Sequence, residues 1–183
     1  MADSPIIELT AAWVEKIHTA APATPVVKPE SPRRILMFSE CVGYVHWVIP
    51  HTSAVIKTLA EKSAAFEVVE TDNAEDFNAE NLKNYDAVLL NNTCSIGGED
   101  GKREMFSDFV EDEALALELK NNVMDFVRNG GGYIAIHGGG LAYLFCPEWE
   151  AMQGATFDFH PPQQEVRLKI VEPDHPLLRA FEG

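Results

Sequence analysis

Four short apolar runs, separated by segments of helical periodicity, constrain the fold of this chain most strongly. The runs are 34–39 (RILMFS), 66–71 (FEVVET), 85–92 (YDAVLLNN) and 133–138 (YIAIHG). Continuous apolar runs are typical of strands that are buried on both faces of a parallel sheet. A fifth segment, 165–172 (EVRLKIVE), alternates between apolar and charged residues and therefore predicts an edge or antiparallel strand.

Helical patterns lie between these runs. Residues 51–61 carry an apolar face, and a longer one over 115–127 stops at Asn129-Gly130-Gly131-Gly132, where glycine can adopt a left-handed cap conformation. Repeated strand–helix units predict a parallel sheet with right-handed crossovers and helices on both faces. We therefore expect a doubly wound, mostly parallel, flavodoxin-like α/β domain with strand order 2-1-3-4-5.

The amino-terminal residues have a different pattern. Residues 5–20 show helical spacing, and the proline-rich stretch 21–32 indicates an extended linker. We therefore divide the chain into an appendage, 1–32, and an α/β domain, 33–183. The first ten residues lack the basic and apolar regions of a signal peptide, and no stretch approaches the roughly 20 apolar residues of a membrane helix.

Charge and cysteine content narrow the function classes. The chain has 14 Lys and Arg against 29 Asp and Glu, a net charge of −15, and its basic residues are scattered, so neither a nucleic-acid nor a membrane partner is expected. Cys41, Cys94 and Cys146 are too few and too far apart for a disulfide framework, which favours a reducing, cytoplasmic location. Self-association is left open.

In doubly wound sheets, ligands bind outside the carboxyl ends of the strands. The first such segment here is SECVGYVHWVIPH, in which His46 can serve as an acid, a base or a ligand for substrate, or can simply cap and pack a loop. The segment also supplies candidate substrate-binding residues, namely Ser39, Gly43, Tyr44 and Trp47.

The fourth run leads into a glycine-flanked polar residue, His137. This arrangement is similar to a nucleophile elbow, in which a sharp turn presents one side chain, although here that side chain is an imidazole. Gly138 and Gly139, followed by a third glycine, would let the backbone approach a ligand closely. Glycine runs also occur in ordinary flexible loops.

Three further features have competing interpretations. His160 precedes two prolines that would fix its direction, yet an exposed turn histidine fits as well. Cys41, Cys94 and His137 could meet as zinc ligands, but a close cysteine pair is missing and we expect no metal or cofactor. The acidic stretch 97–120 is expected to form a surface loop or lid.

Together these segments resemble the ThuA-like (trehalose-utilisation) family of the class I glutamine amidotransferase-like superfamily. The matching pieces are FSECVGYVHWVIP, ENLKNYDAVLLNNT, FVRNGGGYIAIHGG and WEAMQGATFDFHPPQQEVRLKIVEPDHPLLRAF, over roughly residues 33–181. The family pattern continues beyond the Asp-His-Pro segment, so the resemblance implies that this sequence, which stops at Gly183, lacks carboxyl-terminal elements.

The resemblance implies a flavodoxin-like fold and a role in carbohydrate metabolism. Amidotransferase relatives carry a cysteine at the elbow, where this chain has His137, so glutaminase activity is not expected. The leading hypothesis is an enzyme that acts on a sugar or keto-sugar through His46, His137 and His160, with Trp47 or Trp149 as a stacking surface. The alternatives are a non-catalytic sugar-binding or regulatory module, and an interaction scaffold that docks through its amino-terminal helix.

Overall fold

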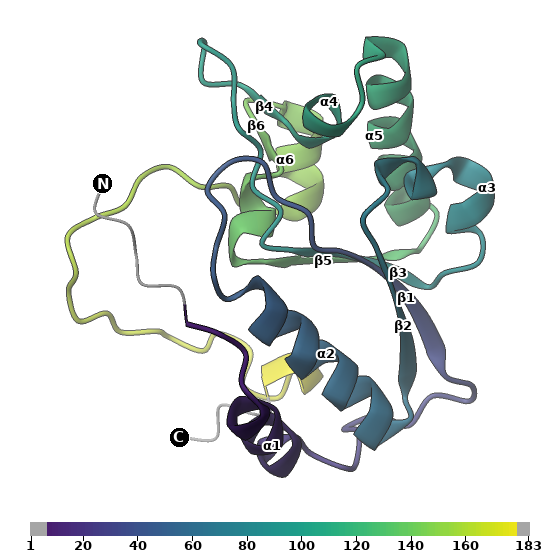
Figure 1. Cartoon of the computed structure of the whole chain (residues 1–183), viewed down its shortest axis with the longest axis vertical. Helices are drawn as coiled ribbons and strands as arrows, with labels where there is room; N and C mark the ends of the chain where they lie inside the picture. Colours follow the sequence, from purple (N-terminus) through teal and green to yellow (C-terminus); the bar gives the residue numbers. More distant parts are fainter. Residues whose placement is uncertain (1–6, 179–183) are drawn as a thin grey trace.

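A four-stranded parallel sheet forms the centre of the molecule (Figure 1). The computed structural model describes residues 7–178. The strands are β1 (Arg33–Phe38), β2 (Phe66–Thr71), β3 (Ala87–Asn91) and β5 (Gly132–Ile136), in the order β2-β1-β3-β5. All three pairings are parallel. The predicted α/β class and the predicted order of the first four strands are confirmed.

Helices cover both faces of the sheet, as in a doubly wound fold. On one face, α2 (Ile49–Ser63) packs over the buried β1 and β3 side chains Ile35, Met37 and Leu89. On the other face, α5 (Glu113–Arg128) lies over the larger core together with the short helices η1 (Ala74–Phe77), α3 (Ala79–Leu82) and α6 (Pro147–Gln153). Alternate residues of one buried strand therefore face different helices, which explains why these strands are continuously apolar.

The amino-terminal helix, α1 (Ala11–Ala20), lies against α2 (Figure 1). The ring centroids of Trp13 and His51 are 5.5 Å apart, and Lys62 of α2 donates hydrogen bonds to the carbonyl oxygens of His18 and Ala21. Sequence periodicity placed the start of this helix at residue 5. Residues 5 and 6 lie outside the described part, and the helix begins after Thr10, whose side chain accepts a hydrogen bond from the backbone N–H of Trp13.

The acidic stretch 97–120, predicted to be a surface loop or lid, is a loop over residues 97–102 and again, briefly, over 110–112. It contains β4 (Arg103–Glu104), α4 (Met105–Phe109) and the first half of α5, and β4 pairs antiparallel with β6 (Tyr143–Leu144). Met105 and Phe106 are completely buried. The burial of Met105 and Phe106 was not predicted from the sequence, because the prediction relied on the high acidic content of the stretch, and most of those acidic side chains are exposed.

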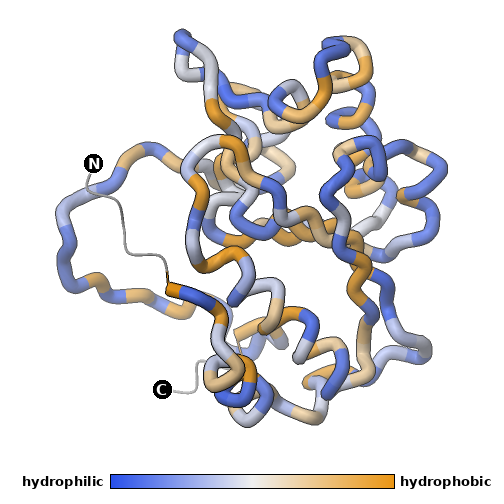
Figure 2. Tube along the Cα trace, in the orientation of Figure 1, coloured by the Kyte–Doolittle hydropathy of each residue, from blue (hydrophilic) through white to orange (hydrophobic). Residues whose placement is uncertain are grey.

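The predicted strand 165–172 is absent, which is a second correction. Between α6 and the 3-10 turn η3 (Pro176–Leu178) the chain forms no helix or strand within its described residues and runs along the outside of the molecule (Figure 1). Leu168 is 87% exposed. Apolar and polar residues alternate along this segment (Figure 2), but alternation becomes a strand only when another strand supplies hydrogen bonds.

No helix within residues 7–178 combines the length and the apolar composition required to cross a bilayer.

Candidate functional site

Two loops meet at the carboxyl edge of the sheet, one after β1 and one after β3. The backbone N–H of Gly43 donates a hydrogen bond to the carbonyl oxygen of Cys94, with an N···O distance of 2.8 Å. A Cβ atom on Gly43 would lie 2.5 Å from the carbonyl oxygen of Ser95, so a larger residue could not approach this closely. The contact fixes the path of the loop that carries Tyr44 and His46.

His137 stands at a sharp turn directly after β5. Its φ angle is +48°, in the left-handed region that non-glycine residues seldom occupy, and it begins the 3-10 helix η2 (His137–Leu141). Such a backbone persists only when its surroundings hold it. Here Gly139 packs directly on Leu90 of β3, since a Cβ on Gly139 would lie 2.5 Å from the Leu90 carbonyl oxygen. The turn leaves the imidazole of His137 exposed.

The loop after β1 and the turn after β5 bring His46 and His137 into direct contact. Their ring centroids are 4.5 Å apart and the rings are nearly perpendicular, at 86°. The Tyr44 ring also contacts the His46 ring, with centroids 4.8 Å apart, and Tyr44 is 51% exposed. The Cε1 atom of His46 also packs against the backbone of Gly138. Three rings from two distant segments are therefore connected through His46 at the edge of the sheet.

The surroundings of His46 favour its neutral form. Burial lowers its pKa from the usual 6.5, and repulsion from His137 lowers it further, while the backbone of Tyr44 acts weakly in the opposite direction. Its Nδ1 atom is buried and makes no hydrogen bond. A neutral imidazole beside an exposed second imidazole can accept a proton while its neighbour donates one.

A polar network also lies at this edge of the sheet, and of its members only Ser39 was singled out from the sequence, as a substrate-binding residue. Asn91, completely buried at the end of β3, donates hydrogen bonds from Nδ2 to Ser53 Oγ at 3.0 Å and to Ser39 Oγ at 3.2 Å. Both serines donate in turn to Oε1 of Glu70 on β2, at 2.7 Å from Ser39 and 2.8 Å from Ser53. Lys57 of α2 pairs with the other carboxylate oxygen. The network links β1, β2, β3 and α2.

Glu70 remains ionised within this network. Burial alone would raise its pKa, but hydrogen bonds from Lys57, Ser39 and Ser53 together outweigh burial and lower it. The adjacent Asn92 has a φ angle of +58° and donates to Asn91 Oδ1 at 2.9 Å. The sequence signal for Asn91 and Asn92 is that two polar residues stand together at the end of a continuously apolar strand.

The cysteines at this edge do not form a metal site. Cys41 Sγ donates to the Tyr44 carbonyl oxygen at 3.2 Å, and Cys94 Sγ contacts the Ser95 carbonyl oxygen at 3.6 Å. Burial raises the pKa of the Cys41 thiol, which keeps it protonated. Among residues 7–178 no group of three His, Cys, Asp or Glu side chains is placed to hold a metal ion, and all three cysteines are free.

Two residues expected at the site, His160 and Trp149, lie elsewhere. His160 is exposed in the segment after α6, where its ring contacts Phe157 at 4.8 Å and neither of the other two histidines. Trp149 is completely buried against Tyr143, with ring centroids 4.3 Å apart, and offers no surface for stacking. Trp47 is half-buried, and its ring packs edge-on against His51.

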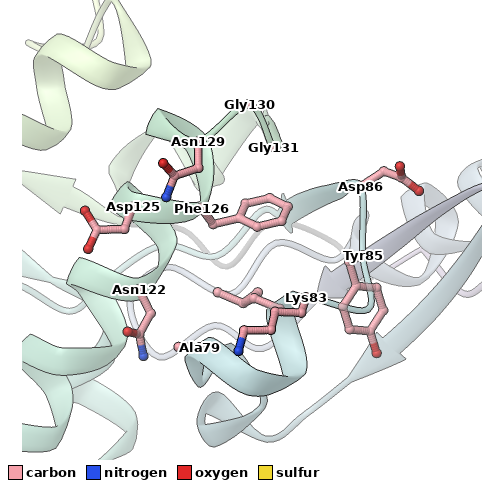
Figure 3. A pocket seen from close by; sticks show the side chains of 11 residues that line it. Ala79, Lys83, Tyr85, Asp86, Asn122, Asp125, Phe126, Asn129, Gly130 and Gly131 are labelled. Carbon is pink, nitrogen blue, oxygen red and sulfur yellow. The ribbon is translucent and has the colours of Figure 1, made fainter.

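A hollow of about 480 Å³ lies at the opposite end of the sheet, between α3 and the end of α5 (Figure 3). Lys83, Asp86 and Asp125 line it, as do the rings of Tyr85 and Phe126. Its charged groups already pair with Glu80, Arg33 and Arg128, respectively. The hollow therefore supplies no unpaired charge that would select a ligand.

Comparison with known proteins adds one finding. The family model described as ThuA, trehalose utilisation, matches residues 34–182, which is nearly the whole α/β domain. No curated protein and no solved structure matches the chain.

Proposed function

The chain belongs to the ThuA family of trehalose utilisation. We propose that the surface around His46 and His137, called the rim below, binds a sugar or keto-sugar and moves a proton from one atom of the bound sugar to another. One observation carries the proposal, namely that two imidazoles from separate loops touch, with centroids 4.5 Å apart. Their position outside the carboxyl ends of parallel strands is where this fold class binds ligands.

The chemistry is a proton shift next to a carbonyl group. The neutral imidazole of His46 removes the proton from the carbon beside the sugar carbonyl, and protonated His137 donates a proton to the carbonyl oxygen, which yields an enediol. His46 then returns its proton to the former carbonyl carbon, and the other hydroxyl of the enediol gives its proton to His137. These two transfers complete an aldose–ketose isomerisation. Both histidines recover their starting states, and no electron acceptor is consumed.

The surrounding residues suit sugar binding. The half-exposed Tyr44 ring beside His46 can stack on the apolar face of a sugar ring. Gly138 and Gly139 do not contribute space for a ligand, because both are buried and pack against Asn92 and Leu90. Because His160 is remote, the proposal assigns acid–base roles to two histidines only.

Two related expectations belong to the same proposal. The elbow residue is His137 where amidotransferase relatives have a cysteine, so we do not propose glutamine hydrolysis. The three free cysteines suit a reducing compartment, which supports a cytoplasmic location.

Solvent hydrogen exchange tests the proposal directly. The protein is incubated with individual aldoses and ketoses in D₂O, and deuterium at the carbon beside the carbonyl is followed by NMR. We expect incorporation with at least one sugar, reduced about 10²–10⁴-fold in His46→Gln and in His137→Gln. His18→Gln, which alters an exposed histidine of α1, serves as the matched control and retains the wild-type rate.

Two outcomes would reject proton transfer at this rim. Exchange that persists in both histidine variants would place the chemistry elsewhere. Sugar-dependent NMR shift changes at the rim without any exchange would instead assign a binding module.

A further inference from the structure

His51, in the first turn of α2, lies buried between two tryptophans. Only 6% of its surface is exposed, and its ring stands nearly perpendicular to the rings of Trp13 and Trp47, with centroid distances of 5.5 Å and 5.3 Å. Neither ring nitrogen of His51 has a hydrogen-bond partner within residues 7–178. The imidazole is therefore held by edge-to-face ring contacts and not by hydrogen bonds.

Trp47 connects this group of three rings to the rim. It directly follows His46 in the loop after β1. The backbone N–H of Ile49, the first residue of α2, donates a hydrogen bond to the carbonyl oxygen of His46 at 3.1 Å. His46 and Trp47 therefore lie in one tight turn. A shift of the Trp47 ring would move the backbone that carries the His46 imidazole.

The third ring belongs to α1, which is lightly held on the domain (Figure 1). None of its residues is buried, and Trp13 itself is 42% exposed. Trp13 attaches the start of the helix to His51, and Lys62 of α2 attaches its end through the carbonyl oxygens of His18 and Ala21. An element that buries so little surface can open locally at a low cost in free energy.

We propose that Trp13 is a positioning residue for His46, because docking of α1 completes the contact series Trp13–His51–Trp47 and thereby holds His46 against His137. Release of α1 would expose His51, free the Trp47 ring and let the two imidazoles separate. The contact between His46 and His137 is then a property of the docked state. The consequence for catalysis rests on the proposed function, whereas the geometry can be measured without any sugar.

NMR titration of the imidazole protons in the full chain tests this role. Burial and repulsion from His137 both lower the pKa of His46, so undocking should raise it toward 6.5. We expect Trp13→Ala to raise this pKa and to weaken the nuclear Overhauser effect between the His46 and His137 rings. Trp13→Phe, which keeps an aromatic ring, should restore the wild-type titration. Val14→Ala is the matched control, since Val14 is also 42% exposed on α1, and it should titrate like the wild type.

Two substitutions of His51 separate ring contact from any polar role of this histidine. His51→Phe keeps an aromatic ring between the two indoles, so His46 should titrate as in the wild type. His51→Ala removes the ring and should raise the pKa of His46 as Trp13→Ala does. Circular dichroism checks that the helices and the sheet persist in each variant, and an unfolded His51→Ala leaves the two Trp13 variants as the deciding pair.

Several results would overturn the positioning role. One is an unchanged His46 titration in Trp13→Ala, and another is an equal change in Val14→Ala. A raised pKa in both phenylalanine variants would also overturn it, because ring contacts could then not be the cause. Deuterium exchange into sugars is measured separately. If no sugar exchanges while the titrations change as expected, the positioning role stands and the proposed function fails.

Discussion

The segment through β5 and the segment after α6 both combine strand-like residues with a histidine, yet only the first becomes part of the sheet. β5 follows α5, whose buried Leu119 and Val123 anchor the crossover on the core. Residues 154–175 follow the short helix α6, and within residues 7–178 only the 3-10 turn η3 follows them, which has no buried residue. The difference shows that a strand pattern needs an anchored connection on both sides before it pairs.

The largest expected contrast comes from making the same substitution in both regions. Leu36→Ala in β1 should lower the free energy of unfolding by about 2–5 kcal/mol, because Leu36 is completely buried. Leu168→Ala should change it by less than about 0.5 kcal/mol. Urea denaturation measures both. Equal losses would mean that Leu168 is buried in the monomer.

A smaller effect is expected from crowding the turn that holds His137. Gly139→Ala should cost about 1–3 kcal/mol, because the new Cβ would lie 2.5 Å from the Leu90 carbonyl oxygen. Gly140→Ala is the control, since its Cβ would meet nothing closer than Gln153 Nε2 at 3.7 Å. Thermal and urea unfolding measure the stability of the two variants. Equal stabilities would contradict the close packing of Gly139 on Leu90.

The buried network predicts an acid-dependent contribution of moderate size. Glu70→Gln should lower stability at pH 7 by about 1 kcal/mol, since it weakens the contacts with Lys57, Ser39 and Ser53. Because the folded pKa of Glu70 lies below its usual 4.5, its contribution is complete above pH 4.5 and is lost as pH falls through the folded value.

Unfolding curves measured between pH 7 and pH 3 should therefore converge for Glu70→Gln and the wild type. Glu67→Gln, in an exposed position on the same strand, serves as the control for the loss of one carboxylate. A constant difference across the whole range would mean that Glu70 does not titrate as described.

The smallest effect concerns the histidine pair. His46 should titrate below 6.5, so its contribution to stability is complete above that pH and decreases as pH falls from 6.5 through the folded value. His137→Gln removes the repulsion between the two imidazoles, so the pKa of His46 should rise. It should stay below 6.5, because the burial of His46 is unchanged.

NMR titration of the imidazole protons measures this shift. His160→Gln should leave the His46 titration unchanged, because His160 contacts Phe157 and not the pair. An equal response to the two substitutions would contradict the separation between the rim and the segment after α6.

Sequence patterns predicted the four strands of the sheet and, in the candidate site, the two histidines but not the network around Glu70. Continuous apolar runs located β1, β2, β3 and β5 to within a few residues, because burial on both faces leaves no polar position in such strands. The rule that ligands bind at the carboxyl edge led to His46 and His137, which the structure brings into contact. Glu70 was missed, because nothing local marks a strand residue that pairs across the sheet.

Residue order by itself determined the α/β class and the turn at His137, since these depend on local periodicity and on flanking glycines. Tertiary structure alone decided that Trp149 is buried, that His160 lies apart from the other two histidines and that residues 165–171 stay unpaired. The physical reason is range. Periodicity records which side of an element is apolar, whereas burial, ring contacts and strand pairing depend on partners that other segments supply.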